Sequence, residues 1–440
     1  MKRKTLALLL ALSFALSMTA CSKETSETAV AKDAFAEDTE DEKEEETKTE
    51  EVETEDVETE EESTVEAETE EETKEAAKKS SANTPSELSD DLYSFQVSID
   101  GTVYQFPMWY SDFESLGWTY DGDNTQTLSS NQYSVVETWE KDGVSVYTQL
   151  ANLSMNTVPF SECMVTGITM DQYDLKDCDW EIILPGGIQY GVSNADDIKA
   201  AYGNPSRDYD GDLYYSMTYE YDSYQDIEFY VYKETNTLGK IDIRNMTELE
   251  GADNSVDATV PDVVKNYKAP SSLGDDYYGT SVEVDGKLYT LPCPVSELVE
   301  NGFTINEANS DMEVGSNNYG WIELRYNNQT YSTIIENYAD YATVAENCFV
   351  TKFESGKYDD MFEITLPGNI SKGSSEADVL KAIEDFNYEK ELSETSSYSY
   401  TYYTIYHPDK SSYDTCYTIQ VEDGVVVGLE AKNDENPNEE

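Results

Sequence analysis

Histidine is almost missing from this 440-residue chain, and its scarcity narrows the chemistry that the chain can perform. The single histidine is His407. Metal sites built from several histidines are excluded, and a serine–histidine–aspartate triad would depend on His407 alone. No nucleophile elbow, phosphate-binding loop or dinucleotide-binding glycine motif occurs. We expect no cofactor, and we expect His407 to be a surface or turn residue at the end of a tyrosine-rich run.

Basic residues are also scarce. The chain has 28 lysines and arginines against 92 aspartates and glutamates, a formal net charge of −64. Such a surface repels nucleic acid and anionic lipid headgroups, so we expect no nucleic-acid partner. It tolerates cationic partners and can collect divalent cations, although a solvated surface is the simpler interpretation.

Cysteine is too sparse for a disulfide framework. Five cysteines lie beyond Cys21, and an odd number cannot all form pairs. They are Cys163, Cys178, Cys293, Cys348 and Cys416. Cys163 and Cys348 precede similar short segments, "MVT" and "FVT", which indicates buried strand residues. A Cys163–Cys178 bridge stays open as an alternative.

The longest apolar run is near the N-terminus and is too short to span a bilayer. "KRK" precedes "TLALLLALSFAL" (residues 5–16), and "SMTAC" follows it, ending at Cys21. This order resembles the lipobox of bacterial lipoproteins, with Met18 where the family usually has leucine. The resemblance implies cleavage after residue 20, lipidation of Cys21 and anchoring in the cell membrane on its extracytoplasmic face. The alternative is an ordinary secretory signal with a chance cysteine.

Residues 21–88 form the next segment, which we predict to be a disordered acidic tether. Residues 33–75 hold 24 acidic residues and 3 lysines, with few large apolar side chains. Such a segment cannot bury enough apolar surface to offset the entropy of ordering. Residues 434–440 form a short acidic tail at the other end of the chain.

Most of the sequence patterns in the remaining chain occur twice. "WEIILPGGIQYGVSNADDIKAAYGNP" (residues 180–205) aligns without gaps on "FEITLPGNISKGSSEADVLKAIEDFN" (residues 362–387), with 12 of 26 positions identical. Three further anchors occur in the same order in both halves. We therefore predict a tandem duplication. Its parts are repeat 1 at residues 89–248, a linker at 249–276 and repeat 2 at 277–433.

Each repeat begins with a predicted hairpin and a short helix. Asp-Gly at 100–101 and 285–286 favours a tight turn between two strands, and Pro107 and Pro292 end the second strand. In the helix that follows, serine is expected as the N-cap and glycine as the stop. The residues are Ser111 and Gly117 in repeat 1, and Ser296 and Gly302 in repeat 2.

A second helix and a group of strands complete each repeat. Ser193 with Asp196, and Ser375 with Asp378, are typical of a helix N-terminus. Gly203 is expected to end the first of these helices. The tyrosine-rich alternating runs that follow indicate antiparallel strands with one buried face. The predicted fold class is α+β: two tandem repeats, each mainly antiparallel β-sheet with one or two short helices.

The second half of each repeat resembles BamE-like and β-lactamase-inhibitor-protein-like modules. The shared pattern is a glycine, a serine cap, a short helix with Asp-Ile or Asp-Val, a Gly-x-Pro stop and antiparallel strands. It is carried by residues 191–205, whereas residues 373–387 lack the stop. The resemblance implies a helix pair packed on a small sheet, and a function in binding proteins. The whole two-part unit also resembles lipoproteins of unknown function from Gram-positive gut bacteria.

Two groups of residues are candidates for ligand contacts. Trp109 and Tyr110 follow Pro107, and repeat 2 has Pro294 and Val295 instead, so the two aromatic side chains are free to contact a sugar or a protein. Alternatively, they cover a local core. In "DYDGDL" (residues 208–213), three aspartates alternate as in a calcium loop, but the further ligands are missing and a hairpin turn is favoured.

The function predicted from these features is non-catalytic binding. We expect a membrane-anchored lipoprotein that acts as a binding or adaptor protein in the cell envelope. Its partners would be the lipid bilayer, through acylated Cys21, and an envelope or extracellular protein. A glycan- or solute-binding lipoprotein is the alternative. A hydrolase that uses paired carboxylates ranks lower, because abundant acids carry no signal by themselves.

Overall fold

A computed structural model describes most of the chain beyond the predicted tether. The described residues are 85–217, 224–358, 362–394, 399–409 and 415–438. The signal segment, Cys21 and nearly all of the acidic tether lie outside them. Within the described residues, no helix is both long and apolar enough to cross a membrane.

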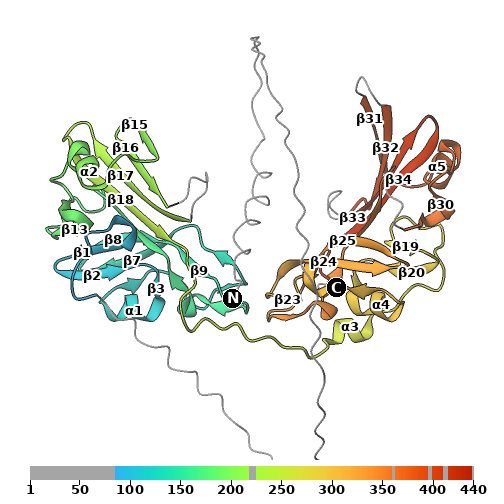
Figure 1. Ribbon diagram of the computed structural model, residues 1–440, viewed down its shortest axis with the longest axis horizontal. Coiled ribbons are helices and arrows are strands. Elements are labelled where there is room, and N and C mark those ends of the chain that lie inside the picture. Colours follow the sequence, from blue (N-terminus) through green and yellow to red (C-terminus); the bar gives the residue numbers. More distant parts are fainter. Residues whose placement is uncertain (1–84, 218–223, 359–361, 395–398, 410–414, 439–440) are drawn as a thin grey trace, which may run out of the picture. The chain divides into compact units, whose positions relative to one another are not determined.

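Helices are short throughout the described chain. The α-helices are α1 (Tyr110–Ser115), α2 (Ala195–Tyr202), α3 (Asp262–Asn266), α4 (Val295–Glu300) and α5 (Glu376–Ala382). The 3₁₀ turns are η1 (Leu92–Ser94), η2 (Phe160–Glu162), η3 (Pro185–Gly187), η4 (Glu307–Asn309), η5 (Ala345–Asn347) and η6 (Pro367–Asn369). Most of the ordered secondary structure is therefore antiparallel β-sheet with few helices, as predicted (Figure 1).

The first half contains one long sheet and three smaller ones. The long sheet has the order β15 (Arg207–Tyr209), β16 (Asp212–Ser216), β17 (Gln225–Tyr232), β18 (Thr237–Asn245), β12 (Gly167–Asp171), β8 (Val144–Thr148), β7 (Glu137–Lys141), β4 (Thr119–Tyr120). The smaller sheets are β14 (Ile188–Gln189), β13 (Ile182–Leu184), β1 (Gln96–Ile99), β2 (Thr102–Gln105); then β3 (Met108–Trp109), β11 (Met164–Val165), β9 (Leu150–Asn152), β6 (Gln132–Tyr133); and β10 (Val158–Pro159) with β5 (Thr127–Leu128).

The second half repeats much of this strand order. Its C-terminal sheet is β28 (Lys352–Ser355), β34 (Val425–Asn433), β33 (Thr415–Glu422), β32 (Ser399–Tyr406), β31 (Tyr388–Glu394). The other sheets are β20 (Lys287–Thr290), β19 (Ser281–Val284), β29 (Ile364–Leu366), β30 (Ile370–Ser371); then β21 (Cys293–Pro294), β27 (Phe349–Val350), β25 (Gln329–Asn337), β24 (Asn318–Tyr326), β22 (Thr304–Ile305); and β23 (Glu313–Val314) with β26 (Thr343–Val344).

Two separate clusters of buried side chains form the cores. One draws only on the first half, and Trp139 lies at its centre without solvent exposure. The other draws only on the second half and includes Leu324 and Phe353, which are equally buried. Alternation along the strands produces both clusters, because every second side chain of a half-buried strand faces the interior. In Figure 1, the strands of each half lie beside the helices of that half.

The predicted hairpins are confirmed at both positions. Asp100 and Gly101 have φ values of 48° and 74°, and Asp285 and Gly286 have 47° and 77°. Positive φ at both central residues defines the two-residue turn whose twist matches the flanking strands. Each following strand ends just before its proline, and both X-Pro peptide bonds, at Pro107 and at Pro292 of the second half, are cis.

The predicted first-helix caps are wrong by two residues. α1 and α4 have Trp109 and Pro294 as N-caps, and neither makes a side-chain cap bond. The serines lie inside the first turn instead. The predicted stops are correct, because each helix ends two residues before Gly117 or Gly302, whose positive φ reverses the chain.

The second-helix caps differ between the halves. In α5, Ser375 is the N-cap and its Oγ accepts a bond from the Asp378 amide at 3.2 Å, as predicted. In α2, the N-cap is Asn194, which forms a capping box with Asp197. Ser193 instead accepts a bond from the Gln189 amide. The one-residue error arose because asparagine caps a helix as well as serine does.

The segment predicted as a linker contributes to the second half. Residues 249–276 contain α3, where Val264 is buried. Tyr267 packs against the second core, and its hydroxyl donates to the Thr290 carbonyl at 3.1 Å. This segment is therefore anchored on the second half rather than being a free connection.

Matching asparagines make the same hydrogen bonds in both halves. Asn152 donates through Nδ2 to the carbonyls of residues 128, 129 and 156, and Asn337 does so to those of residues 314, 315 and 341. Asn245 and Asn433 each donate to the carbonyl just before a cis-proline. Four corresponding asparagines thus hydrogen-bond carbonyls at equivalent places of the two halves.

Candidate binding site

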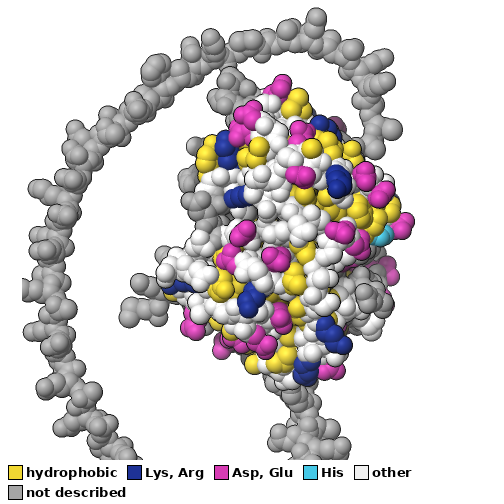
Figure 2. All heavy atoms as spheres, turned by 90° about the vertical axis from the view of Figure 1, so that its right-hand side faces the viewer, with side chains coloured by type: hydrophobic (Ala, Val, Ile, Leu, Met, Phe, Trp, Pro, Cys, Tyr) yellow, Lys and Arg dark blue, Asp and Glu magenta, His cyan; other side chains and the backbone are white. Residues whose placement is uncertain are grey.

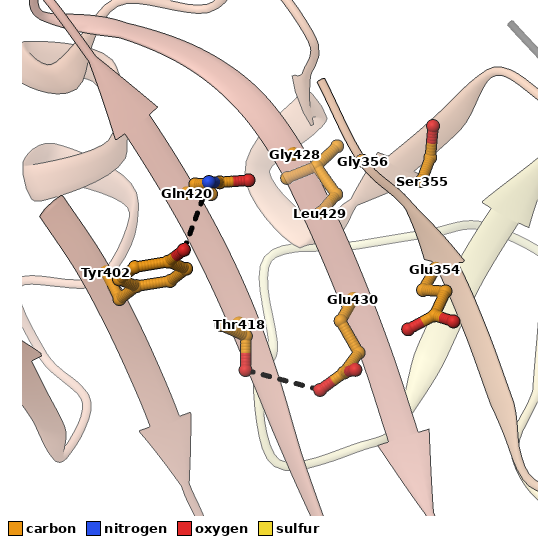
Figure 3. Close-up of a pocket in the computed structure, with 9 residues that line it drawn as sticks. All are labelled: Glu354, Ser355, Gly356, Tyr402, Thr418, Gln420, Gly428, Leu429 and Glu430. Atoms are coloured by element: carbon orange, nitrogen blue, oxygen red, sulfur yellow. Dashed lines mark hydrogen bonds between the residues drawn. The ribbon is translucent and has the colours of Figure 1, made fainter. Parts of the chain in front are cut away.

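A hollow opens in the outer face of the C-terminal sheet (Figure 3). Its volume is about 380 Å³. Strand alternation turns one set of side chains toward the core and leaves the other set on this outer face. The residues that line the hollow come from β28 and its extension, β34, β33 and β32. They are Glu354, Ser355, Gly356, Tyr402, Thr418, Gln420, Gly428, Leu429 and Glu430.

Two carboxylates stand at one end of the hollow. Glu354 and Glu430 are directly opposite each other on β28 and β34. Lys352 lies near both, with its Nζ 2.9 Å from Glu354 and 4.0 Å from Glu430. Burial raises the pKa of Glu430, and the positive charge of Lys352 partly opposes that shift. Among these three groups, one negative charge is in excess.

Neutral polar groups form the other side of the hollow. The Thr418 hydroxyl donates to Glu430 Oε1 at 3.4 Å, and Gln420 Nε2 donates to the Tyr402 hydroxyl at 3.1 Å. Figure 3 shows these side chains on the same side of the sheet as Glu430. Ser355 points away from Glu354, as alternation requires, and its buried Oγ has no hydrogen-bond partner among the described residues.

The hollow exists because two glycines supply no side chains there. Ser355 pairs with Leu429, so the next position of this ladder places Gly356 opposite Gly428. A Cβ on Gly428 would lie 2.6 Å from Gln420 Oε1 and 3.4 Å from the Ser355 carbonyl oxygen. Lys372 donates to the Gly356 carbonyl oxygen at the edge of the hollow.

The first half has charged side chains at the same register. There, β12 and β18 occupy the places that β28 and β34 hold in the second half, and Asp171 is directly opposite Lys240. Lys240 Nζ lies 3.9 Å from Glu228 Oε2. A cationic side chain of the protein therefore lies where the second half has its paired glycines.

Ion pairs cover the rest of this face in the first half. Arg244 donates to Asp226 Oδ2 through Nε and Nη2, at 3.1 and 2.6 Å. Arg207 contacts Asp212 and Glu228, each at 3.1 Å. Burial raises the pKa of Asp226, while Arg244 opposes that shift. The charges of this face are thus largely matched by partners within the protein.

The predicted ligand contacts Trp109 and Tyr110 lie in the interior. Trp109 is 6% exposed and Tyr110 is 2% exposed. The Tyr110 ring packs against Tyr120 and Trp139, with centroids 5.9 and 4.7 Å away. These positions agree with the alternative that the pair covers a local core, and we do not retain the pair as ligand contacts.

The aspartates of residues 208–213 form a hairpin turn, the favoured interpretation. Tyr209 pairs with Asp212, and Asp210 and Gly211 have positive φ between them. Each aspartate pairs with its own cation: Asp208 with Lys199, Asp210 with Lys233 and Asp212 with Arg207. Among the described residues, no group of three or more histidine, cysteine or acidic side chains is arranged to hold a metal ion.

The cysteines and the histidine that were considered as candidates lie in the packed or hydrogen-bonded parts of the fold. Cys163 and Cys348 are buried, and each immediately precedes a short strand. Cys178 is a free thiol, so this structure contains no Cys163–Cys178 bridge. His407 follows β32, where its ring packs edge-on against Tyr278 and its Nδ1 accepts a bond from the Asp409 amide.

Sequence reasoning did not find the hollow. Glu354 and Glu430 are two of 92 acidic residues, and their pairing depends on strand register. One signal was available: aligning the two predicted repeats places glycines at 356 and 428 against Asp171 and Lys240. On the face drawn in Figure 2, basic side chains stand singly or in small groups among the acidic ones.

Comparisons with known proteins add nothing to this geometry. No protein-family model, curated protein or solved structure matches the chain.

Proposed function

We propose that this chain is a lipid-anchored binding protein of the cell envelope, and that the hollow of the C-terminal sheet is its ligand site. The observation that carries the proposal is the hollow itself: a cavity of about 380 Å³ lined by convergent polar groups. Binding is its role, and no catalytic step is part of the proposal.

Tandem duplication supports the assignment of different roles to the two halves. Residues 89–248 and 277–433 are proposed to be copies of one α+β module, separated by the segment 249–276. Matching strand order, cis-prolines and asparagine bonds support this relationship. Where one copy maintains the fold with matched charges, the other copy is free to change the same face.

Anchoring through Cys21 is the second part of the proposal. Its support is the lipobox-like order of charge, apolar run, small residues and cysteine. In a bacterial host, the full chain should partition with membranes and incorporate a clickable palmitate analogue. Cys21→Ala should lose the label and be released from the membrane, because acyl chains provide stable attachment. Equal labelling of both proteins would contradict the anchor.

Site-specific photocrosslinking in cells tests the binding role. A benzoylphenylalanine at position 402 of the full chain should form adducts with the ligand, since Tyr402 borders the hollow and its replacement leaves both carboxylates in place. The matched control is position 230, because Tyr230 is the aromatic residue opposite Lys240 on the corresponding face of the first half. Adducts at 402 alone are expected. Adducts at neither position, or at both alike, would refute the assignment of this face.

A glycan-binding function is the second candidate, and an exposed aromatic surface favours it. Tyr319 and Trp321 alternate on β24 and are 46% and 47% exposed, and Ile334 lies opposite Trp321 on β25. Aromatic rings on a sheet face can stack on sugar rings. Quenching of Trp321 emission by envelope glycan, lost in Trp321→Ala, would favour this candidate over the hollow.

A further inference from the structure

We propose that the hollow binds an alkylammonium group, the protonated primary amine at the end of a short carbon chain. The inference depends on the proposed function, because it names the ligand chemistry of the same site. The group could be carried by a free amine or by the lysine side chain of a peptide, and both sources share the chemistry argued here.

The first half of the protein indicates what fits this place. Lys240 extends from β18 and lies 3.9 Å from Glu228, on the outer face of its sheet. Its charge also opposes the upward shift that burial causes in the pKa of Asp242, the counterpart of Glu430. Gly428 occupies the position on β34 that corresponds to Lys240 on β18. The second half therefore has no cationic side chain from this strand at that place.

The charges around the hollow leave room for one cation. Among the described residues, Lys352 is the lysine within 4.0 Å of both Glu354 and Glu430, and it lies two positions before Glu354, on the side away from the glycines. The other lysines near the hollow have partners of their own: Lys372 donates to the Gly356 carbonyl, Lys357 pairs with Glu422, and Lys432 pairs with Asp434. A bound ammonium group would balance the remaining carboxylate charge, which is costly to keep partly buried.

Oxygen atoms face the place that the ammonium group would occupy. An ammonium group has three N–H donors and no acceptor, so its site must offer acceptors. Gln420 Oε1 lies 2.6 Å from the point where a Cβ of residue 428 would stand. The Thr418 hydroxyl and the Glu430 carboxylate are hydrogen-bonded neighbours on the same side of the sheet. Three oxygen-bearing groups therefore border the space that replaces the Lys240 side chain.

The size of the hollow agrees with a small group. A volume of about 380 Å³ lies at the lower end of the range for small-molecule sites. The net charge of −64 also concentrates cations near the surface, which favours capture of amines over anions.

Nuclear magnetic resonance of the full chain, labelled with ¹⁵N only at glycine, tests the inference. Gly356 and Gly428 report on the hollow, and Gly239 reports on the matching face of the first half. Cadaverine and Nα-acetyl-lysine methylamide are the probes, titrated in 150 mM salt, and 1,5-pentanediol is the uncharged control. Saturable shifts of Gly356 with the amines, and none with the diol, are expected.

Gly428→Lys is the decisive variant, because it supplies the hollow with its own ammonium group. The only sub-3 Å neighbour of the new Cβ is the mobile end of Gln420, so the fold should accommodate it. Amine affinity measured at Gly356 should fall about tenfold or more. Glu430→Gln preserves shape and should weaken amine binding by a similar factor, which keeps the test valid if the lysine variant misfolds.

The reverse exchange should create a second site. Asp171→Gly combined with Lys240→Gly removes both side chains that fill the first half's face. Cadaverine should then also shift Gly239, with saturation, whereas it leaves Gly239 unchanged in the wild-type protein.

The outcomes separate the two proposals. Shifts with cadaverine alone identify a free amine as the source, and shifts with the lysine derivative alone identify a peptide. Equal responses to the diol and the amines, or amine binding that survives both Gly428→Lys and Glu430→Gln, would overturn the ammonium assignment. Crosslinks specific to position 402 would still support the proposed function in that case, and their absence would refute it independently.

Discussion

The two large sheets share five strands in the same order, but the outer faces of these strands contain different side chains. In the first half, Arg244, Arg207 and Lys240 each contact a carboxylate within 4 Å, so the face is covered by the protein's own ion pairs. In the second half, Gly356 and Gly428 leave the corresponding register bare and a hollow opens. Glycines replace the pair of Asp171 and Lys240, and Glu354 and Gln420 replace Thr169 and Tyr230, so a few exchanges on equivalent strands distinguish a structural face from a candidate binding face.

The largest expected effect concerns the independence of the two cores. Trp139→Ala should cost about 3–5 kcal/mol, because it leaves a cavity in a fully buried cluster. Leu324→Ala removes the matching side chain of the second half and should cost about 2–5 kcal/mol. Because the two clusters share no residue, each variant should accelerate amide hydrogen exchange chiefly in its own half, although hydrogen bonds such as that from the Ser130 amide to Ser316 Oγ join the halves.

Hydrogen-exchange mass spectrometry measures both halves in one experiment, and the two variants serve as controls for each other. Equal acceleration in both halves by either variant would show a single cooperative unit. The two halves would then unfold together and would have no separate stabilities to compare.

The second prediction concerns the ion pairs that cover the outer face of the long sheet in the first half. Arg244→Met leaves Asp226, which has a side chain only 7% exposed, without its guanidinium partner. Removal of one member of such a buried pair should cost about 3 kcal/mol. Lys432→Met, at the matching position, breaks a pair in which both side chains are about a quarter exposed, and should cost less than about 1 kcal/mol.

Denaturant unfolding of the two variants gives both numbers. Adding Asp226→Asn to Arg244→Met should recover part of the loss, because the uncompensated charge is then removed. Equal losses at positions 244 and 432 would show that the two faces do not differ in their structural role.

The comparison also shows which features sequence patterns can reveal. Asp-Gly at 100–101, the glycine stops and the alternating tyrosine runs predicted turns, helix ends and strands, because each depends on local backbone preferences. The helix cap at Asn194 was misplaced by one residue, since asparagine and serine compete for the same role. Local backbone preferences thus predicted the existence of helices, strands and turns better than they predicted where those elements begin and end.

Local sequence patterns could not predict the candidate site. Glu354 and Glu430 are 76 positions apart and become neighbours only through the register of β28 with β34. Trp109 and Tyr110 differ from the corresponding residues of the second predicted repeat, yet both are buried, and Tyr110 packs against Trp139. Differences between the halves indicate function only when they fall on an exposed face, and exposure depends on long-range packing.

The smallest expected effect is a pH-dependent gain in stability. Burial raises the pKa of Glu430 above its ordinary value of 4.5, so the folded protein holds this proton to a higher pH than the unfolded chain does. In the interval between those two pKa values, the folded state binds more protons, and stability therefore falls as pH rises. Glu430→Gln removes this loss. The variant should be more stable than the wild type at pH 7, and the difference should shrink as pH falls toward 4.5 and below. Thermal unfolding from pH 4 to pH 7 measures this difference in stability.

Glu354→Gln is the matched control, because it removes the same charge from an exposed side chain and breaks a contact with Lys352. It should therefore give no gain in stability at pH 7. A Glu430→Gln protein less stable than the wild type at pH 7 would mean that Lys352 compensates the partly buried carboxylate fully, and that the hollow has no unbalanced charge to offer a ligand.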